Sequence, residues 1–200
     1  MTPQELLDVR WDKEFFRVLG LLPATKKVEW YETPTPFTGV GVGAWVPGKG
    51  VFRGTGGAVN AYYDLGAAFS KILTVISGVA MTNGNSYIGY KVAPPAAVGS
   101  DGYLAFTGAA LRQLYKFSGG FTLLSSNNDN ENVNGTISSM AFYWDGVAKV
   151  FQQFQRIGSG NWHQCDGAAG DATFAALRYV QLGNDGVDTF FGGPVVIYAG

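Results

Sequence analysis

The sequence predicts a mainly β protein, an antiparallel β-sandwich or jelly roll preceded by one α-helix. Three observations support this fold class. Glycine accounts for 29 of the 200 residues, about twice its usual share, and it punctuates short apolar stretches. Asp-Gly and Asn-Gly pairs recur between these stretches, as they do in β-hairpin turns. Helical periodicity is confined to the start of the chain, before Gly20.

The segment 1–22 has the signature of an amphipathic helix. Thr2 and Glu5 have the spacing of a capping box, Pro3 suits the first helical position, and Gly20 is a typical C-terminal stop. Four apolar residues at helical spacing form one stripe: Leu7, Trp11, Phe15 and Val18. We expect this stripe to be covered, either by the chain's own sandwich or by docking on a partner subunit.

The distribution of charge divides the chain near residue 32. Residues 1–32 carry five basic and six acidic side chains, whereas residues 33–200 carry nine of each sign. We therefore expect a helical arm with a linker over 1–32 and a β-sandwich domain over 33–200. The formal net charge of −1 argues against nucleic-acid binding, which needs a concentrated basic surface. No run of 18 apolar residues occurs, so we expect no membrane span.

The clearest β unit runs from Thr136 to Arg156. Met140, Phe142 and Trp144 alternate with the residues between them, and Asp145-Gly146 follows. This pattern predicts a hairpin with a type I′ turn, which would hold Gly146 at positive φ. Further strands are expected over 72–81, 86–92, 103–107, 121–125, 172–182 and 194–198.

The chain offers little catalytic chemistry. His163 and Cys165 are the single residues of their types, so no internal disulfide forms. Two apart on a strand, they point the same way, but no helix N-terminus lowers the thiol pKa, and we expect packing roles for both. Glycoside hydrolysis usually needs two facing carboxylates, and Glu131 is the one glutamate after Glu32. We therefore predict that the protein is not an enzyme.

The segment 127–132 is rich in oxygen ligands of the kind that calcium prefers. Its spacing does not match an EF-hand. A solvated loop is the expected reading, with calcium held by Asn128, Asp129 and Asn130 as the alternative. No other cofactor is predicted.

Aromatic residues are more numerous than one thin core usually absorbs. Rings with polar tips suit both sugar faces and protein interfaces. Four of them are candidate ligand contacts: Trp45, Tyr62, Tyr143 and Trp162. The alternative is that these rings fill the core of the sandwich.

Several stretches resemble the concanavalin A-like, or laminin-G-like, lectin sandwich. They are Tyr63-Asp64-Leu65-Gly66, Trp144-Asp145-Gly146, 159–163, 177–183 and the closing strand in 190–198. The resemblance spans about residues 58–200 and implies the fold and a binding role. The calcium- and manganese-dependent Asp and Asn set of legume-type lectins cannot be placed here, nor can the laminin-G calcium aspartates, so no ligand is identified.

The first residues lack a basic region followed by an apolar run, so no secretory signal is visible. Lectin-like sandwiches of cellular origin are usually exported, whereas phage capsid and tail proteins assemble in the cytoplasm. We therefore expect a virion component, a capsid decoration or tail accessory protein, that forms homo-oligomers or binds other virion proteins or a surface glycan. The alternative is a secreted, extracellular carbohydrate-binding module, and the second alternative is a glycoside hydrolase on the same fold.

Overall fold

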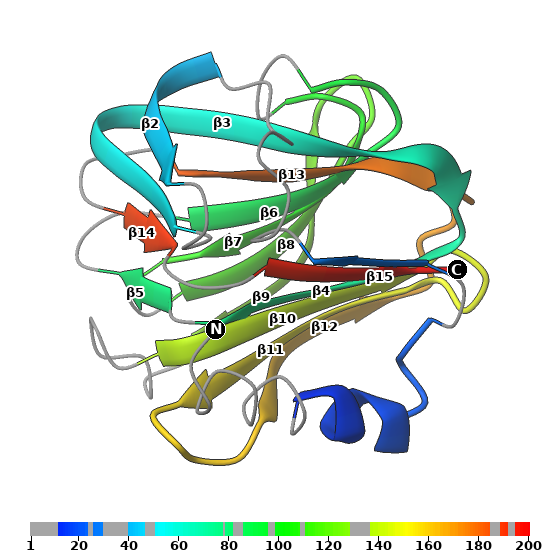
Figure 1. Cartoon of the computed structure of the whole chain (residues 1–200). Helices are drawn as coiled ribbons and strands as arrows, with labels where there is room; N and C mark the ends of the chain where they lie inside the picture. Colours follow the sequence, from blue (N-terminus) through cyan, green and yellow to red (C-terminus); the bar gives the residue numbers. More distant parts are fainter. Residues whose placement is uncertain are drawn as a thin grey trace.

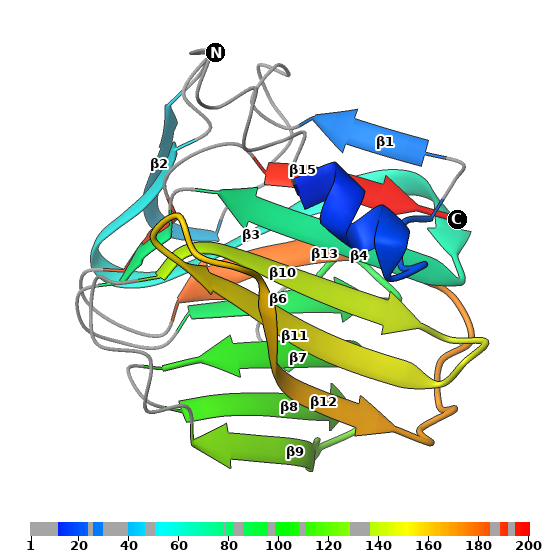
Figure 2. The same cartoon turned by 90° about the horizontal axis from the view of Figure 1, so that it is seen from below.

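The computed structural model describes residues 12–23, 26–29, 40–46, 51–77, 79–81, 86–95, 99–108, 111–128, 137–184, 189–191 and 195–200. Two antiparallel sheets pack face to face, and a short helix over residues 12–18 lies outside one of them (Figures 1 and 2). The predicted β-sandwich with an N-terminal helix is therefore confirmed. Among these residues, no helix is long and apolar enough to cross a membrane.

The first sheet has six strands in the order β1-β15-β4-β10-β11-β12. Their bounds are β1 (Lys26–Glu29), β15 (Val195–Ala199), β4 (Lys71–Ser77), β10 (Ile137–Asp145), β11 (Val150–Ile157) and β12 (His163–Ala169). Strand β1 belongs to the stretch expected as a linker, and it pairs with β15, which lies between β1 and β4 in the sheet.

The second sheet has nine strands in the order β5-β14-β3-β13-β6-β7-β8-β9, with β2 paired to β3. Their bounds are β2 (Val40–Val46), β3 (Val51–Phe69), β5 (Val79–Met81), β6 (Ser86–Lys91), β7 (Gly102–Thr107), β8 (Leu111–Phe117), β9 (Phe121–Asn128), β13 (Leu177–Asn184) and β14 (Thr189–Phe191). The sequence-based strands correspond to β4 with β5, β6, β7, β9, β13 and β15. Strands β2 and β8 and the first part of β3 were not expected.

The main core fills the space between the sheets. Alternate residues of each strand point inward, as the period of two requires. Ile76, Phe142 and Trp144 come from the six-stranded sheet, and Tyr90 and Leu114 come from the nine-stranded sheet. The Tyr90 hydroxyl donates a hydrogen bond to the carbonyl of Phe142 over 2.8 Å, so this contact crosses from one sheet to the other.

The helix packs on the outer face of the six-stranded sheet (Figure 2). Phe16 is fully buried there against Leu73, Tyr143 and their neighbours. The chain's own sandwich covers the expected stripe only in part: Phe15 is half-buried and packs on this cluster, whereas Val18 is 70% exposed. Docking of the stripe on a partner subunit stays a prediction. Residues 16 and 18 lie about 200° apart around a helix, so they cannot both face the sheet. Two further stripe residues, Leu7 and Trp11, lie outside the described residues.

The hairpin of β10 and β11 is confirmed, but its turn differs from the expectation. Asp145 pairs with Val150, so four residues, 146–149, form the loop. Lys149, not Gly146, has positive φ, at 57°. The Asp145 carboxylate accepts hydrogen bonds from the backbone N–H groups of the next residues, 147 and 148, and these contacts fix a longer turn than type I′.

Candidate functional site

The outer face of the nine-stranded sheet carries a row of aromatic side chains over β6 to β9. Antiparallel register places Phe106 beside β8, and Tyr115 beside β7 and β9. Adjacent ring centroids lie 5.0–5.8 Å apart in edge-on or tilted contacts. The row consists of Tyr87, Phe106, Tyr115, Phe121 and Phe117.

The solvent side of this row is unusually apolar and is hollowed. Phe121 is 52% exposed and Leu123 is 50% exposed, so strand β9 displays large side chains to solvent. A depression of about 190 Å³ lies beside them, lined by Phe106, Gly108, Leu111, Gln113 and Tyr115. We call the seven side chains of this surface the aromatic face: Phe106, Leu111, Gln113, Tyr115, Phe117, Phe121 and Leu123.

The aromatic face is uncharged. The charged residues of β7 to β9 are Arg112 and Lys116, and both point inward, toward the six-stranded sheet. The Arg112 guanidinium donates to the Gln155 side chain over 2.9 Å, and the Lys116 ammonium donates to Asp171 over 2.7 Å. The polar groups of this face are therefore the Gln113 amide and the Tyr115 hydroxyl, and both can donate and accept hydrogen bonds.

Lys91, in β6, lies on the same side of the nine-stranded sheet as the aromatic face, but it has no exposed surface. Its ammonium donates to the carbonyl of Ser100 over 2.7 Å. Burial lowers the pKa of this lysine to about 7, although Asp101 nearby opposes the change. Gly89 makes room for it, because a Cβ there would lie 2.8 Å from the Lys91 Cε atom.

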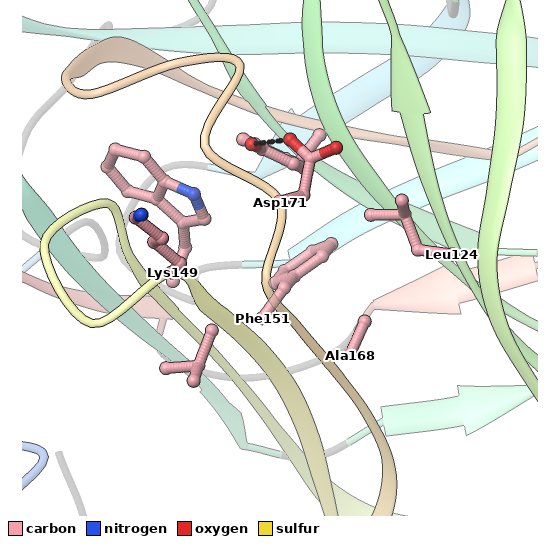
Figure 3. Close-up of a pocket in the computed structure, with 8 residues that line it drawn as sticks. Leu124, Lys149, Phe151, Ala168 and Asp171 are labelled. Carbon is pink, nitrogen blue, oxygen red and sulfur yellow. Dashed lines mark hydrogen bonds between the residues drawn. The ribbon is translucent and has the colours of Figure 1, made fainter.

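A second, smaller pocket opens between the two sheets at the start of β11 (Figure 3). Leu124, Phe151 and Ala168 form its apolar part, and Lys149 and Asp171 lie at its edge (Figure 3). Its free volume of about 10 Å³ is enough for about one water molecule. The pocket is therefore too small for an organic ligand.

The Asp171 carboxylate at this edge is bound by neighbouring side chains of the protein. It accepts hydrogen bonds from the Tyr103 hydroxyl over 2.5 Å and from Lys116. Burial opposes ionisation of Asp171, but the hydrogen bonds from Lys116, Tyr103 and Thr173 outweigh it and lower the pKa well below the ordinary value. Asp171 thus ties its loop to the nine-stranded sheet.

The four predicted ligand contacts do not converge. Tyr62 is half-buried against Tyr179 on β13, several strands away from the aromatic face. Tyr143 is 3% exposed, and its hydroxyl donates to Asp145, so we correct its assignment to packing. Trp162 lies at the other sheet, and the side chain of the remaining candidate, Trp45, lies outside the described residues.

The remaining chemical candidates are also placed. Cys165 is the extra residue of a β-bulge in β12, and its thiol contacts the carbonyl of Gln153 at 3.4 Å. His163 contacts the amide of Gln155. The described residues contain no group of three or more His, Cys, Asp or Glu that could hold a metal ion. The calcium candidates Asp129 and Asn130 and the side chain of Asn128 lie outside the described residues.

The described aspartates serve the fold. Each has a partner within the chain: Asp12 has Arg156, Asp64 has Arg178, Asp101 has the backbone N–H of Gly119, Asp145 has Tyr143, Asp166 has Ser125 and Asp171 has Lys116. Strands β7, β8 and β9 themselves contain no carboxylate. The aromatic face therefore lacks the facing pair of acids that glycoside hydrolysis usually requires.

The sequence analysis missed the aromatic face. A signal for it was present: Phe117 and Phe121 flank Ser118-Gly119-Gly120, a hairpin turn between two runs with alternating large apolar residues. That pattern places Tyr115, Phe117 and Phe121 on one side of a hairpin. It does not say which side faces solvent.

Comparison with known proteins supports the fold. No protein-family model matches the sequence, and no curated protein matches it. Among solved structures, the chain is similar to the Ca²⁺/Man2-bound exoplasmic/lumenal domain of VIP36, with TM-score 0.64, 9% identity, and 90% of each chain covered. It is similar to winged bean acidic lectin in complex with methyl-α-D-galactose, with TM-score 0.62, 10% identity, and 87% and 98% covered.

A third similar structure is the carbohydrate-binding module CBM66 from Bacillus subtilis, with TM-score 0.58, 17% identity, and 82% and 96% of the two chains covered. At these identities the similarity establishes the concanavalin A-like sandwich and no more. The expected fold is therefore confirmed. The expectation of a virion component receives no support from these structures.

Proposed function

We propose that the protein is a non-enzymatic, lectin-like carbohydrate-binding module that binds neutral glycans on its aromatic face. The observation that carries this proposal is the uncharged row of rings centred on Tyr115, in which Phe106, Tyr115 and Phe117 are half-buried and Phe121 is exposed. Aromatic rings pack against the C–H faces of sugar rings, and the Gln113 amide is placed to hydrogen-bond hydroxyl groups. This favours the alternative reading of the sequence over the virion component.

The fold supports the same proposal. Each of the three similar structures named above is a lectin, a sugar-bound domain or a carbohydrate-binding module by its description. The partnered aspartates and the absence of carboxylates on β7 to β9 favour binding over hydrolysis. A homo-oligomer, an extracellular location and bound calcium stay predictions.

A glycan array followed by calorimetry tests the proposal. We expect binding to neutral glycans, and we expect Tyr115→Ala to weaken it about tenfold or more, because the central ring of the row is lost. Phe121→Ala should act in the same direction. Adding EDTA in parallel tests the calcium expectation at residues 128–130.

Val147→Ala is the matched control, because Val147 is 71% exposed but belongs to the loop between β10 and β11. It should bind like the unmodified protein. Melting temperatures of all variants separate loss of contact from loss of fold. Failure to bind any neutral glycan, or equal binding by Tyr115→Ala and Val147→Ala, would contradict the proposal.

A further inference from the structure

A third hollow lies outside the six-stranded sheet, where the helix meets β11 and β12. Its volume is about 300 Å³, at the lower end of the range of small-ligand pockets. Phe15, Leu19 and Leu21 come from the helix and the residues after it, and they face Phe154 and Trp162. We call this hollow the helix groove.

The polar wall of the helix groove is uncharged and loosely bonded. Gln152 donates to the Gln164 side chain over 3.3 Å, and Gln164 donates to the backbone carbonyl of Asp166 over 3.3 Å. Both bonds are longer than the usual ~2.7–3.2 Å, so ligand hydroxyls replace them at little cost. His163 completes this wall.

Gly167 leaves space for the Gln164 amide. A Cβ at residue 167 would lie 2.5 Å from the Gln164 Nε2 atom. The obstruction is the far end of a flexible side chain, so an alanine there displaces the amide without disturbing the backbone of β12. The position of the polar group in the groove therefore depends on this glycine.

The charges beside the groove cancel one another. Asp12 and Arg156 form an ion pair at 3.3 Å, with both side chains largely buried. The indole N–H of Trp162 donates to Asp12 over 2.8 Å. A ligand in the groove thus meets an apolar wall and amide groups, with no net charge to attract an acidic or basic peptide.

We propose that the helix groove binds one neutral sugar ring, as a second site separate from the aromatic face. This rests on the proposed function for the chemistry of its ligand. The apolar wall matches the C–H surface of a pyranose, and the two glutamine amides match its hydroxyl groups. The two sites lie on opposite sheets, so one molecule engages two glycan ends.

Nuclear magnetic resonance titration with methyl α-D-mannoside and methyl α-D-galactoside tests the two sites separately. The Trp162 indole and the Gln164 side-chain amide report the helix groove, and the Gln113 amide reports the aromatic face. We expect both sets of signals to shift. Gly167→Ala should weaken the groove titration about tenfold and leave the Gln113 titration unchanged, whereas Tyr115→Ala should do the reverse.

Gly120→Ala is the matched control for the glycine substitution, because nothing lies within 4 Å of a Cβ at that position. Shifts at Gln113 alone would overturn the helix-groove site and keep the proposed function. Shifts at Trp162 and Gln164 alone, sensitive to Gly167→Ala, would support the groove and overturn the aromatic face. No shift at either site would overturn both.

Discussion

Lys91 is a lysine without exposed surface, and its burial ties stability to pH. In the folded chain the pKa of Lys91 is about 7, below the ordinary lysine value of about 10.4. At a pH between these two values the unfolded chain therefore binds one more proton than the folded chain. The free energy of unfolding should therefore rise with pH from 7 to 9.5, by at most about 1.4 kcal/mol per unit. Lys91→Met should remove this slope.

Urea unfolding at several pH values measures the slope. Lys13→Met is the control, because Lys13 is exposed on the helix and should leave the slope unchanged. A slope that persists in Lys91→Met would show that another group causes it.

Gly146 is required by space and not by backbone conformation. A Cβ there would lie 2.6 Å from the carbonyl oxygen of Ala175 and 2.8 Å from the ring of Trp144. Gly146→Ala should destabilise the protein by about 1–3 kcal/mol, because neither the backbone nor the buried indole moves easily. Thermal unfolding beside Gly120→Ala checks this, and equal melting temperatures for the two variants would refute it.

At the scale of elements, the helix is held by Phe16. Phe16→Ala should cost about 3–5 kcal/mol, the range for a buried phenylalanine. Val18→Ala, at a residue that is 70% exposed, should change stability by less than about 0.5 kcal/mol. Urea unfolding of the two variants distinguishes the observed packing from the stripe expected from sequence. A larger cost for Val18→Ala would favour the stripe.

Local patterns predicted most elements for physical reasons. Alternation around Phe142 and the Asp145-Gly146 pair identified the β10–β11 hairpin, because period two and turn residues are local properties. The sequence could not show that Phe16 is buried more deeply than Phe15, because both residues are apolar. Which of the two is buried depends on how the helix packs on the six-stranded sheet, and this packing is not a local property of the sequence.

The first part of the long strand β3 was missed because glycines in 51–57 read as loop signals. Its pairing with β2, β13 and β14 overrides that local preference. The aromatic face escaped prediction for a related reason. Tyr115 lies in an alternating run, but the sequence does not reveal which of its two faces packs on the other sheet.

At the scale of the whole molecule, the order of layers explains the burial of the central strands. Strands β4 and β10 have the nine-stranded sheet on one side and, on the other side, the helix with the buried residues around Phe16. Both strands therefore lack an exposed face over most of their length. Among the described residues, no helix covers the outer side of the nine-stranded sheet over β8 and β9, and this is the side that we propose for glycan binding.

The position of β15 has a kinetic consequence. This strand follows all the others in the sequence, yet it lies between β1 and β4. Among the described strands β1 pairs with β15 alone, so this early strand gains that neighbour only when the C-terminal strand has been added. Closing so long a stretch of chain is entropically costly, and it places this protein among slow-folding topologies. Until that step, the edge of β4 that β15 later covers is unpaired and open to pairing with other chains.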